Sequence, residues 1–358
     1  MSRKDYMRLA FALAKKGLNN TGSNPMVGAV LVKNGLIIGK GYHVEFGGLH
    51  AEANAIKDAE RKGFSVKNAK LFVTLEPCSH VKKKTPPCSH LIVEKGIKEV
   101  FIGMKDPNKK VNGKGIRFLK KYNIKTTVLD YKIENEELNK GFISLMKTKR
   151  PYVTLKICSS MDGKIYNLEN PKESIGDKIQ LKHANKLRKN YDGILVGINT
   201  VLKDNPRLDY RGPKIKSYSQ PRPIILDSKL RIPINSKVIS ENNKPIIFTQ
   251  ETSSKRKIEI LMKLGCEIII IKAMKPKEIL LRLASLNLQR ILIEGGGEIF
   301  SSFLASKFWN ELIIYYSPKF LGRSGLALTQ HLSNQFLVKN KYSITTKKIG
   351  RSLMLRIN

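Results

Sequence analysis

The sequence predicts an α/β protein of two domains, and three observations support this prediction. The chain has 358 residues, about twice the size of a common single domain. Along most of its length, stretches with helical spacing of apolar residues alternate with short apolar runs of strand length. This alternation pauses at a basic, proline-ended connector over 147–151 and then restarts. We therefore predict one domain at 1–147 and a second at 148–358.

The first domain is expected to open with a helix over 5–16, because its apolar residues fall on one stripe. Strands over 27–32 and 36–41 follow, joined by Asn34-Gly35, a dipeptide typical of tight hairpins. Another helix is expected from His50. The remaining elements alternate as strand 70–75, helix 89–95, strand 99–103, helix 113–122, strand 124–129 and helix 133–146.

The second domain repeats this alternation from residue 152 onward. We expect its strands at 152–157, 193–196, 223–226, 245–249, 267–272, 290–294, 311–316 and 342–356. We expect its helices at 178–189, 254–264, 276–285 and 298–305. Three glycines, 295–297, separate the strand 290–294 from the helix that follows it.

The composition is that of a globular protein with an unusual charge. No apolar run is long enough to cross a membrane. Four cysteines do not make a disulfide framework in a chain of this length, so we expect a reducing cytoplasm. The net charge of +37 favours anionic ligands. However, the lysines are dispersed and the aromatic residues do not interleave with them, so a nucleic-acid partner is the less favoured interpretation.

His50, Cys78 and Cys88 form the strongest chemical pattern in the chain, with Glu52 beside them. Zinc favours imidazole and thiolate ligands, and three protein ligands leave a fourth position for water. Zinc lowers the pKa of a bound water to about 7, and Glu52 is placed to carry protons. Residues two apart on a helix point about 200° apart, which suits a proton carrier rather than a ligand. The pattern H-x-E, P-C and C predicts a zinc-dependent deaminase.

Other interpretations of these residues stay open at this point. Cysteines in an intracellular protein are more often small buried residues than ligands. His80 and His90 lie close enough in the sequence to compete as zinc ligands. The spacing is also unusual, because such deaminases commonly carry C-x-x-C, whereas residues 79–87 separate Cys78 from Cys88.

Three polar segments follow strands of the second domain, at 159–164, 197–208 and 294–297. Ligands of open α/β sheets bind at the carboxyl ends of strands, and backbone N–H groups at a glycine turn that opens a helix suit phosphate. The glycines do not follow G-x-G-x-x-G, so a standard dinucleotide fingerprint is not indicated. Together the segments favour a cleft for a dinucleotide and a substrate.

With both sets of motifs in view, the chain resembles the bifunctional deaminase/reductase family of bacterial riboflavin biosynthesis. The first domain carries N-P-M-V-G at 24–28, F-G-G-L-H-A-E at 46–52, T-L-E-P-C-S-H at 74–80, T-P-P-C at 85–88 and D-P-N at 106–108. The second carries S-M-D-G-K at 160–164, V-G-I-N-T-V at 196–201, D-N-P-R-L at 204–208 and E-G-G-G at 294–297. The long cysteine spacing is this family's own form.

The resemblance implies a cytidine-deaminase-like α/β/α domain followed by a dihydrofolate-reductase-like α/β domain. It implies hydrolysis of the ring amino group of a diamino-hydroxy-pyrimidine that carries a phosphoribosylamino group, and then reduction of the ribosyl group to ribityl with NADPH. The substrate is thus a small phosphorylated pyrimidine. We also expect a homo-oligomer.

The family's functional residues carry over to matching positions of this chain. Zinc ligands are His50, Cys78 and Cys88, and the catalytic proton carrier is Glu52. Substrate contacts in the first domain are Asn24, His43, Lys84 and Asp106. NADPH contacts in the second domain are Ser159, Thr200, Asp204, Ser228, Gly296 and Gly297, and substrate contacts there are Ser174, Arg188, Leu208, Arg211 and Glu294. Arg188 and Arg211 suit a substrate phosphate, because a guanidinium offers a bidentate fork.

One departure from the family pattern concerns the reductase half. The family carries a Ser-x-Trp-Ile segment after the Asp-Gly-Lys turn, whereas the only tryptophan here is Trp309. Alignment back from Arg188 puts Ser174 at the tryptophan position, whereas a gap placed later would make Ser174 the family serine. The missing tryptophan leaves open a deaminase whose reductase half has lost activity. The zinc pattern and the net charge of +37 leave open a nucleic-acid deaminase that acts on tRNA or single-stranded DNA.

Overall fold

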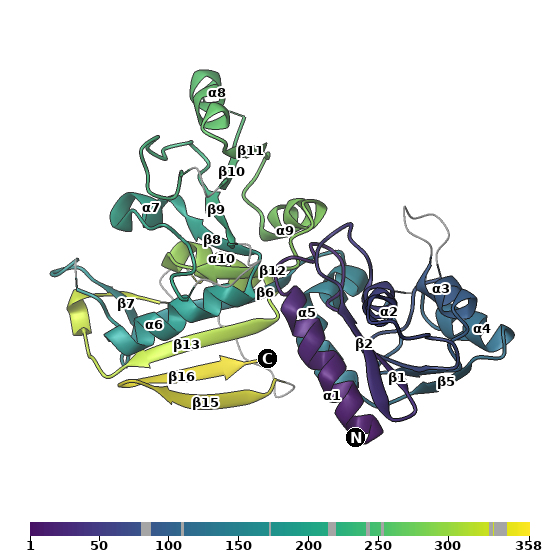
Figure 1. The fold of residues 1–358 in the computed structure, drawn as a ribbon. Coiled ribbons are helices and arrows are strands. Elements are labelled where there is room, and N and C mark those ends of the chain that lie inside the picture. Colours follow the sequence, from purple (N-terminus) through teal and green to yellow (C-terminus); the bar gives the residue numbers. More distant parts are fainter. Residues whose placement is uncertain are drawn as a thin grey trace. The chain divides into compact units, whose positions relative to one another are not determined.

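The computed structural model describes residues 1–79, 87–108, 111–171, 173–213, 220–240, 244–251, 254–328, 332 and 342–358. The chain divides into two compact units, Met1–Lys149 and Arg150–Asn358. The division falls inside the basic connector 147–151, two residues after the predicted boundary. Each unit has its own sheet (Figure 1).

The first unit is built on a five-stranded sheet in the order β2-β1-β3-β4-β5. Its strands are β1 (Gly28–Lys33), β2 (Leu36–Tyr42), β3 (Lys70–Val73), β4 (Glu99–Ile102) and β5 (Lys125–Val128). β1 pairs antiparallel with β2 and with β3, whereas β3, β4 and β5 are parallel. Asn34 and Gly35 both have positive φ, 50° and 78°, as the predicted tight hairpin requires.

Helices cover both faces of this sheet, which makes the unit an α/β/α sandwich. They are α1 (Arg3–Ala14), α2 (Ala51–Arg61), α3 (Cys88–Glu94), α4 (Lys114–Lys121) and α5 (Lys132–Thr148), with a 3-10 turn at Lys15–Gly17. Ala29 and Leu31 of β1 pack in one core with α2, α3 and α4, while Val30 and Val32 pack in another with α1. Because both faces are buried, β1 reads as an unbroken apolar run.

Two glycines of β2 let α2 approach the sheet closely. A Cβ on Gly39 would lie 2.2 Å from the Ala55 carbonyl oxygen, and a Cβ on Gly41 would lie 2.3 Å from the Ala51 carbonyl oxygen. Both distances are too short for any side chain. The glycines therefore fix how near the start of α2 lies to the sheet, and His50 directly precedes that start.

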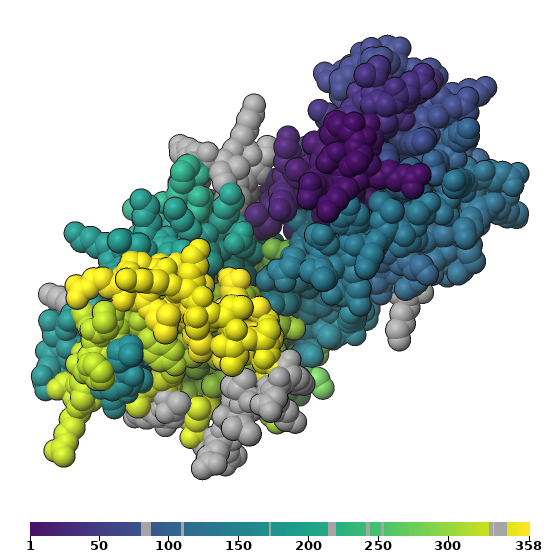
Figure 2. Space-filling model, turned by 90° about the horizontal axis from the view of Figure 1, so that it is seen from below, coloured from purple at the N-terminus to yellow at the C-terminus, as the bar shows by residue number. Residues whose placement is uncertain are grey.

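The second unit is built on a nine-stranded sheet in the order β11-β10-β9-β8-β12-β6-β13-β16-β15. Its strands are β6 (Tyr152–Ser160), β8 (Gly193–Gly197), β9 (Arg222–Leu226), β10 (Ile246–Thr249), β11 (Glu267–Ile270), β12 (Arg290–Glu294), β13 (Glu311–Ser317), β15 (Ile344–Ile349) and β16 (Ser352–Ile357). The strands from β11 to β13 are parallel, and β16 and β15 continue the sheet antiparallel. Figure 2 shows this last pair, in yellow, at the surface of the second unit.

The helices of the second unit pack against this sheet. They are α6 (Lys178–Leu187), α7 (Ile198–Asp204), α8 (Lys255–Lys263), α9 (Pro276–Ser285) and α10 (Gly297–Ser306), with 3-10 turns at Arg188–Asn190 and Gly322–Ser324. One core joins β6 and β12 to α9 and α10, and another joins β8, β9 and β10 to α7 and α8. A separate two-stranded sheet pairs β7 (Lys164–Asn167) with β14 (Gly325–Ala327).

The predicted elements are confirmed with boundary shifts of a few residues. The structure adds α7, β7 and β14, which the periodicity did not predict, and it splits the expected strand 342–356 into the hairpin β15–β16. None of the helices in the described part of the chain is both long and apolar enough to span a membrane.

Candidate functional site

Three segments of the first unit bring His50, Cys78 and Cys88 together. His50 is the residue before α2, Cys78 follows β3, and Cys88 is the first residue of α3. The His50 Nδ1 atom lies 3.5 Å from Cys78 Sγ and 3.3 Å from Cys88 Sγ. The three candidate ligand atoms all lie within 4.8 Å of one another. The structure thus places the predicted zinc ligands as one group.

The thiols themselves fit a metal ion. A hydrogen bond from Cys88 is the main factor that lowers the pKa of Cys78 to about 4, while the same bond and burial raise the pKa of Cys88. The two sulfurs therefore share one proton without a metal, and a dication can replace that proton. The donor set of one imidazole and two sulfurs is the softer type that zinc favours.

Glu52 lies in the first turn of α2 and is only 3% exposed. Burial raises the pKa of its carboxyl, which contacts Cys88. It does not belong to the ligand group found among the described residues. The position agrees with the predicted proton carrier, which lies beside the ligands.

Of the two rival ligands, His90 is not supported as an alternative. The ring of His90 stacks on Phe118 at 4.1 Å between centroids, and His90 is not part of the ligand group that the described residues form. His80 lies outside the described residues, as does the predicted substrate contact Lys84.

Two predicted substrate contacts, Asn24 and His43, are hydrogen-bonded to each other. His43 is buried, and its Nδ1 lies 3.0 Å from the Leu49 carbonyl oxygen. A carbonyl only accepts, so Nδ1 carries the proton. The neutral ring then accepts at Nε2 from the Asn24 amide at 3.1 Å. His43 also packs edge-on against His50, with 5.4 Å between centroids.

The buried carboxylate of Glu76 positions the remaining predicted contact, Asp106. Its oxygens accept from the backbone N–H groups of Asp106, Gly113 and Ile116 at 3.1, 2.9 and 3.2 Å. Glu76 thereby ties the loop before α4 to the segment that carries Cys78. The sequence analysis missed this role, although an acidic residue at the end of an apolar strand was a signal for it.

In the second unit, a cavity of about 570 Å³ lies at the carboxyl ends of the central strands. Five of the six predicted NADPH contacts line it: Thr200, Asp204, Ser228, Gly296 and Gly297. The sixth, Ser159, is fully buried and its hydroxyl donates to the Ser160 carbonyl oxygen at 2.7 Å. The structure therefore does not bring the Ser159 side chain into the cavity wall.

The glycine turn at this cavity suits a phosphate group. Gly295 and Gly296 have φ values of 120° and 42°, conformations that other residues rarely adopt. The first N–H groups of a helix have no partner within the helix, and the dipole of α10 favours an anion at its start. The residues present therefore fit the pyrophosphate of a dinucleotide.

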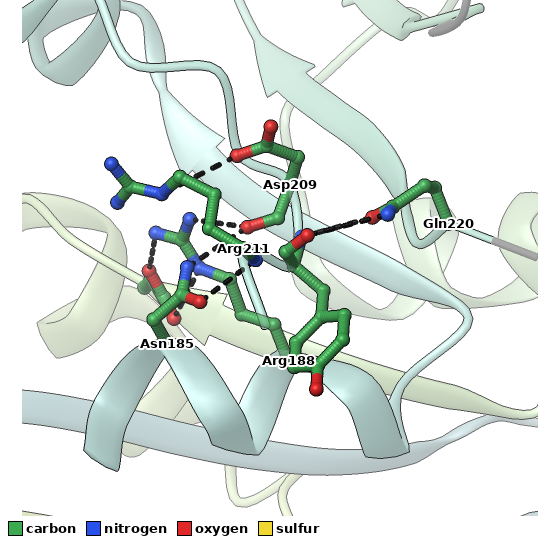
Figure 3. Close-up of polar contacts among 7 residues, drawn as sticks. Asn185, Arg188, Asp209, Arg211 and Gln220 are labelled. Carbon is green, nitrogen blue, oxygen red and sulfur yellow. Dashed lines mark hydrogen bonds and ion pairs between the residues drawn. The ribbon is translucent and has the colours of Figure 1, made fainter. Parts of the chain in front are cut away.

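Arg188 and Glu294, two predicted substrate contacts, form an ion pair with each other. The Arg188 guanidinium donates to both carboxylate oxygens, from Nε at 3.1 Å and from Nη2 at 2.7 Å, and its Nη1 donates to the Asp209 carbonyl oxygen at 3.0 Å (Figure 3). Burial opposes ionisation of Glu294, but Lys156 and Arg188 outweigh it and lower the pKa of the carboxyl. The Arg188 guanidinium, which we predicted to bind a phosphate, binds the Glu294 carboxylate in this structure.

Arg211 and Leu208 lie in the neighbouring segment. Arg211 lines a second cavity of about 430 Å³ together with Arg188, Arg207 and Lys237, and its side chain is 63% exposed. Figure 3 shows Asn185 and Arg188 reaching from α6 and the turn after it toward this segment. Leu208 is buried and holds a φ of 56°, a strained conformation for a side chain of this size.

Ser174 does not replace the missing aromatic ring. Its hydroxyl donates to the Gly176 carbonyl oxygen at 2.9 Å, and its own carbonyl accepts from Lys319 at 2.8 Å. It is not among the residues that line the two cavities of this site. The structure thus uses Ser174 to close a turn.

Comparison with known proteins matches both units. The family model "Cytidine and deoxycytidylate deaminase zinc-binding region" matches residues 1–104, and the model "RibD C-terminal domain" matches residues 151–349. Riboflavin biosynthesis protein RibD of Aquifex aeolicus is 39% identical over 91% of this chain and 89% of its own length. RibD of Bacillus amyloliquefaciens is 40% identical over 88% and 85%.

Solved structures agree over the whole chain. A diaminohydroxyphosphoribosylaminopyrimidine deaminase/5-amino-6-(5-phosphoribosylamino)uracil reductase from Thermotoga maritima is similar with a TM-score of 0.85 and 36% identity, covering 99% of this chain and 98% of that one. Acinetobacter baumannii RibD gives 0.84 and 30% with the same coverage. The predicted fold class of both domains is confirmed. The chain belongs to the RibD family of riboflavin-biosynthesis enzymes, with a zinc-binding deaminase half and a reductase half that uses NADPH.

Proposed function

We propose that the first unit hydrolyses the ring amino group of 2,5-diamino-6-(5-phosphoribosylamino)pyrimidin-4(3H)-one, and that the second unit reduces the ribosyl group of the product to ribityl with NADPH. The single observation that carries this proposal is the group of His50, Cys78 and Cys88 with the buried Glu52 beside it. The match of relatives over both units supports the second step.

In the first site, Glu52 moves the protons. A zinc ion held by His50, Cys78 and Cys88 would supply an activated water as the nucleophile. Glu52 takes a proton from the attacking water and delivers protons to the ring nitrogen and to the departing amine. Burial raises the pKa of this carboxyl, which makes it a stronger base than an exposed glutamate.

His43, Asn24 and Asp106 hold the pyrimidine in this site. The hydrogen bond to Leu49 fixes the tautomer of His43, and the bond from Asn24 fixes the ring. Asp106 is itself positioned by Glu76. Such preset polar groups select one orientation of a ring that displays several donors and acceptors.

In the second site, the glycine turn and the start of α10 bind the pyrophosphate of NADPH, and Thr200, Asp204 and Ser228 bind the rest of the nucleotide. Arg211 binds the phosphate of the substrate. Arg188 contributes the donors that remain after its bonds to Glu294 and Asp209. Glu294 positions Arg188 through their ion pair, and Leu208 follows Arg207 in the segment that lines the cavity of about 430 Å³. The hydroxyls of Ser174 and Ser159 donate to backbone carbonyl oxygens of the protein.

The alternatives have less support. A nucleic-acid deaminase has no use for the matched reductase half. The missing tryptophan is the reason to consider that the reductase half has lost activity. Against this, the glycine turn and five of the expected NADPH contacts line one cavity, which supports NADPH binding. The four cysteines form no disulfide bonds with one another, which fits the cytoplasmic location that we propose. The homo-oligomer stays a prediction.

A coupled assay tests both steps. Zinc-loaded protein is incubated with the pathway's diaminopyrimidine phosphate, and ammonia and NADPH are followed in time. We expect ammonia first and NADPH oxidation second. No ammonia from folded, zinc-loaded protein would contradict the deaminase function, and ammonia without NADPH oxidation would favour an inactive reductase half.

A further inference from the structure

Arg231 lines the NADPH cavity of the second unit, and it is not among the contacts expected above. We propose that Arg231 selects NADPH over NADH by pairing with the phosphate on the 2′-oxygen of the adenosine ribose. The proposal rests on the reductase function and adds a specificity-determining residue to it.

The topology places Arg231 beside the pyrophosphate position. β12, β8 and β9 are neighbouring parallel strands, so their carboxyl ends meet at one edge of the sheet. β12 leads into the glycine turn, β8 into α7, and β9 into a turn over 227–232. β9 is two strands from β12, about 10 Å. A ribose attached to the pyrophosphate reaches across such an interval.

The turn after β9 is rigidly built. Asp227 is fully buried, and its carboxylate accepts from the Ile232 backbone N–H at 2.8 Å. The Leu230 N–H donates to the Asp227 carbonyl oxygen at 3.0 Å. Leu230 is buried with a φ of 50°, a conformation that persists only where the surroundings enforce it. This turn presents both Ser228 and Arg231 to the cavity.

The charge of Arg231 is available to an anion. Its Nη2 donates to the Asn199 side-chain oxygen at 2.9 Å, and it forms no ion pair with a carboxylate of the described residues. Arg188 differs, because Glu294 already neutralises its guanidinium. The bond to neutral Asn199 orients the Arg231 fork and leaves further N–H groups to donate.

A second cation stands in the same wall. Lys203 of α7 lines the cavity, with its ammonium 4.3 Å from the centroid of the Tyr166 ring. A phosphate monoester carries nearly two negative charges at neutral pH. The Arg231 guanidinium and the Lys203 ammonium together supply two positive charges. The carboxylates of Asp204 and Glu298 also line the cavity. They repel a phosphate, so the phosphate is favoured beside Arg231 and Lys203 and not elsewhere along the wall.

The discrimination follows from the chemistry of the two cofactors. NADH differs from NADPH only in lacking this phosphate, so a residue that binds the phosphate affects one cofactor and not the other. Charged hydrogen bonds contribute enough that loss of the guanidinium weakens NADP⁺ binding by about 10- to 100-fold. NAD⁺ binding should change by less than about threefold.

Calorimetric titration of the full chain with NADP⁺ and with NAD⁺ tests this. The variants are Arg231→Ala, Arg231→Lys and the matched control Lys229→Ala, which removes an exposed cation of the same turn that does not line the cavity. We expect Arg231→Ala to lose NADP⁺ affinity alone, Arg231→Lys to keep part of it, and Lys229→Ala to keep all of it.

Equal losses for Arg231→Ala and Lys229→Ala would overturn the proposal, because the effect would then be one of overall charge. Equal losses for both nucleotides in Arg231→Ala or Arg231→Lys would also overturn it. Wild-type protein that bound neither nucleotide would overturn the reductase function and this proposal with it. Wild-type protein that bound both equally would overturn the proposal alone.

Discussion

The Glu52 carboxyl is enclosed by protein and lies beside two thiols, and burial raises its pKa. The raised pKa makes this carboxyl a stronger base than a solvent-exposed carboxylate, which helps it to accept a proton. His50 stands two positions earlier on the same chain segment. In the proposed mechanism, the short H-x-E spacing thus serves two different purposes, metal binding and proton transfer.

Replacing Glu52 by Gln should keep zinc and lower the rate of ammonia release by about 10²- to 10⁴-fold, because the amide cannot move a proton. The measurements are zinc content and ammonia release. NADPH oxidation on substrate that is already deaminated should not change.

Glu60→Gln is the control, since Glu60 lies on the same helix and pairs with Lys95 at the surface. Equal loss of both activities in Glu52→Gln would show that the two sites are not separable. Ammonia release at the wild-type rate would contradict the role of Glu52.

Individual contacts were the hardest part of the site to predict from sequence. The grouping of His50, Cys78 and Cys88 could be expected from residue chemistry, but the pairing of Arg188 with Glu294 joins residues 106 positions apart. A sequence pattern shows which groups are present and not which neighbour each one meets. The same holds for Glu76, whose three donors come from the segment 106–116, at least 30 positions away.

The distance between β2 and α2 determines where His50 lies. Gly41 has no space for a Cβ, which would meet the Ala51 carbonyl oxygen and the Ala55 nitrogen at 2.3 Å each. These atoms belong to the backbone, so they cannot rotate away. Any side chain at residue 41 must push the first turn of α2 outward and move His50 with it.

Replacing Gly41 by Ala should therefore lower the free energy of unfolding by about 1–3 kcal/mol and weaken zinc binding. Denaturant unfolding and zinc titration measure the two effects. Lys40→Ala is the control, because Lys40 is the exposed neighbour on the same strand. Wild-type stability and zinc affinity in Gly41→Ala would contradict this account of the packing.

Most helices and strands could be predicted from periodicity, and the exceptions have physical reasons. β7 and β14 are four and three residues long and exist through pairing with each other, which no local pattern reveals. α7 has seven residues and begins directly after β8, so its polar residues resemble a loop. The hairpin β15–β16 turns at Gly350, with a φ of 60°, inside the stretch that we predicted as one strand.

At the scale of the whole molecule, the chain joins two α/β units that each carry one chemistry. The first holds the ligand group and Glu52, and the second holds the cavity with the glycine turn. The net charge of +37 suits a chain whose substrate and cofactor both carry phosphate, because it attracts anions at low ionic strength. The order of the units matches the order of the two proposed steps.

The central claim is that ammonia release depends on a metal ion bound by His50, Cys78 and Cys88. The most direct test is titration of zinc into chelator-treated protein while ammonia release from the pyrimidine substrate is measured. We predict activity that rises with bound zinc and saturates at about one equivalent per chain, with no rise in Cys88→Ala. Full ammonia release from zinc-free protein, or none at saturating zinc, would contradict the account.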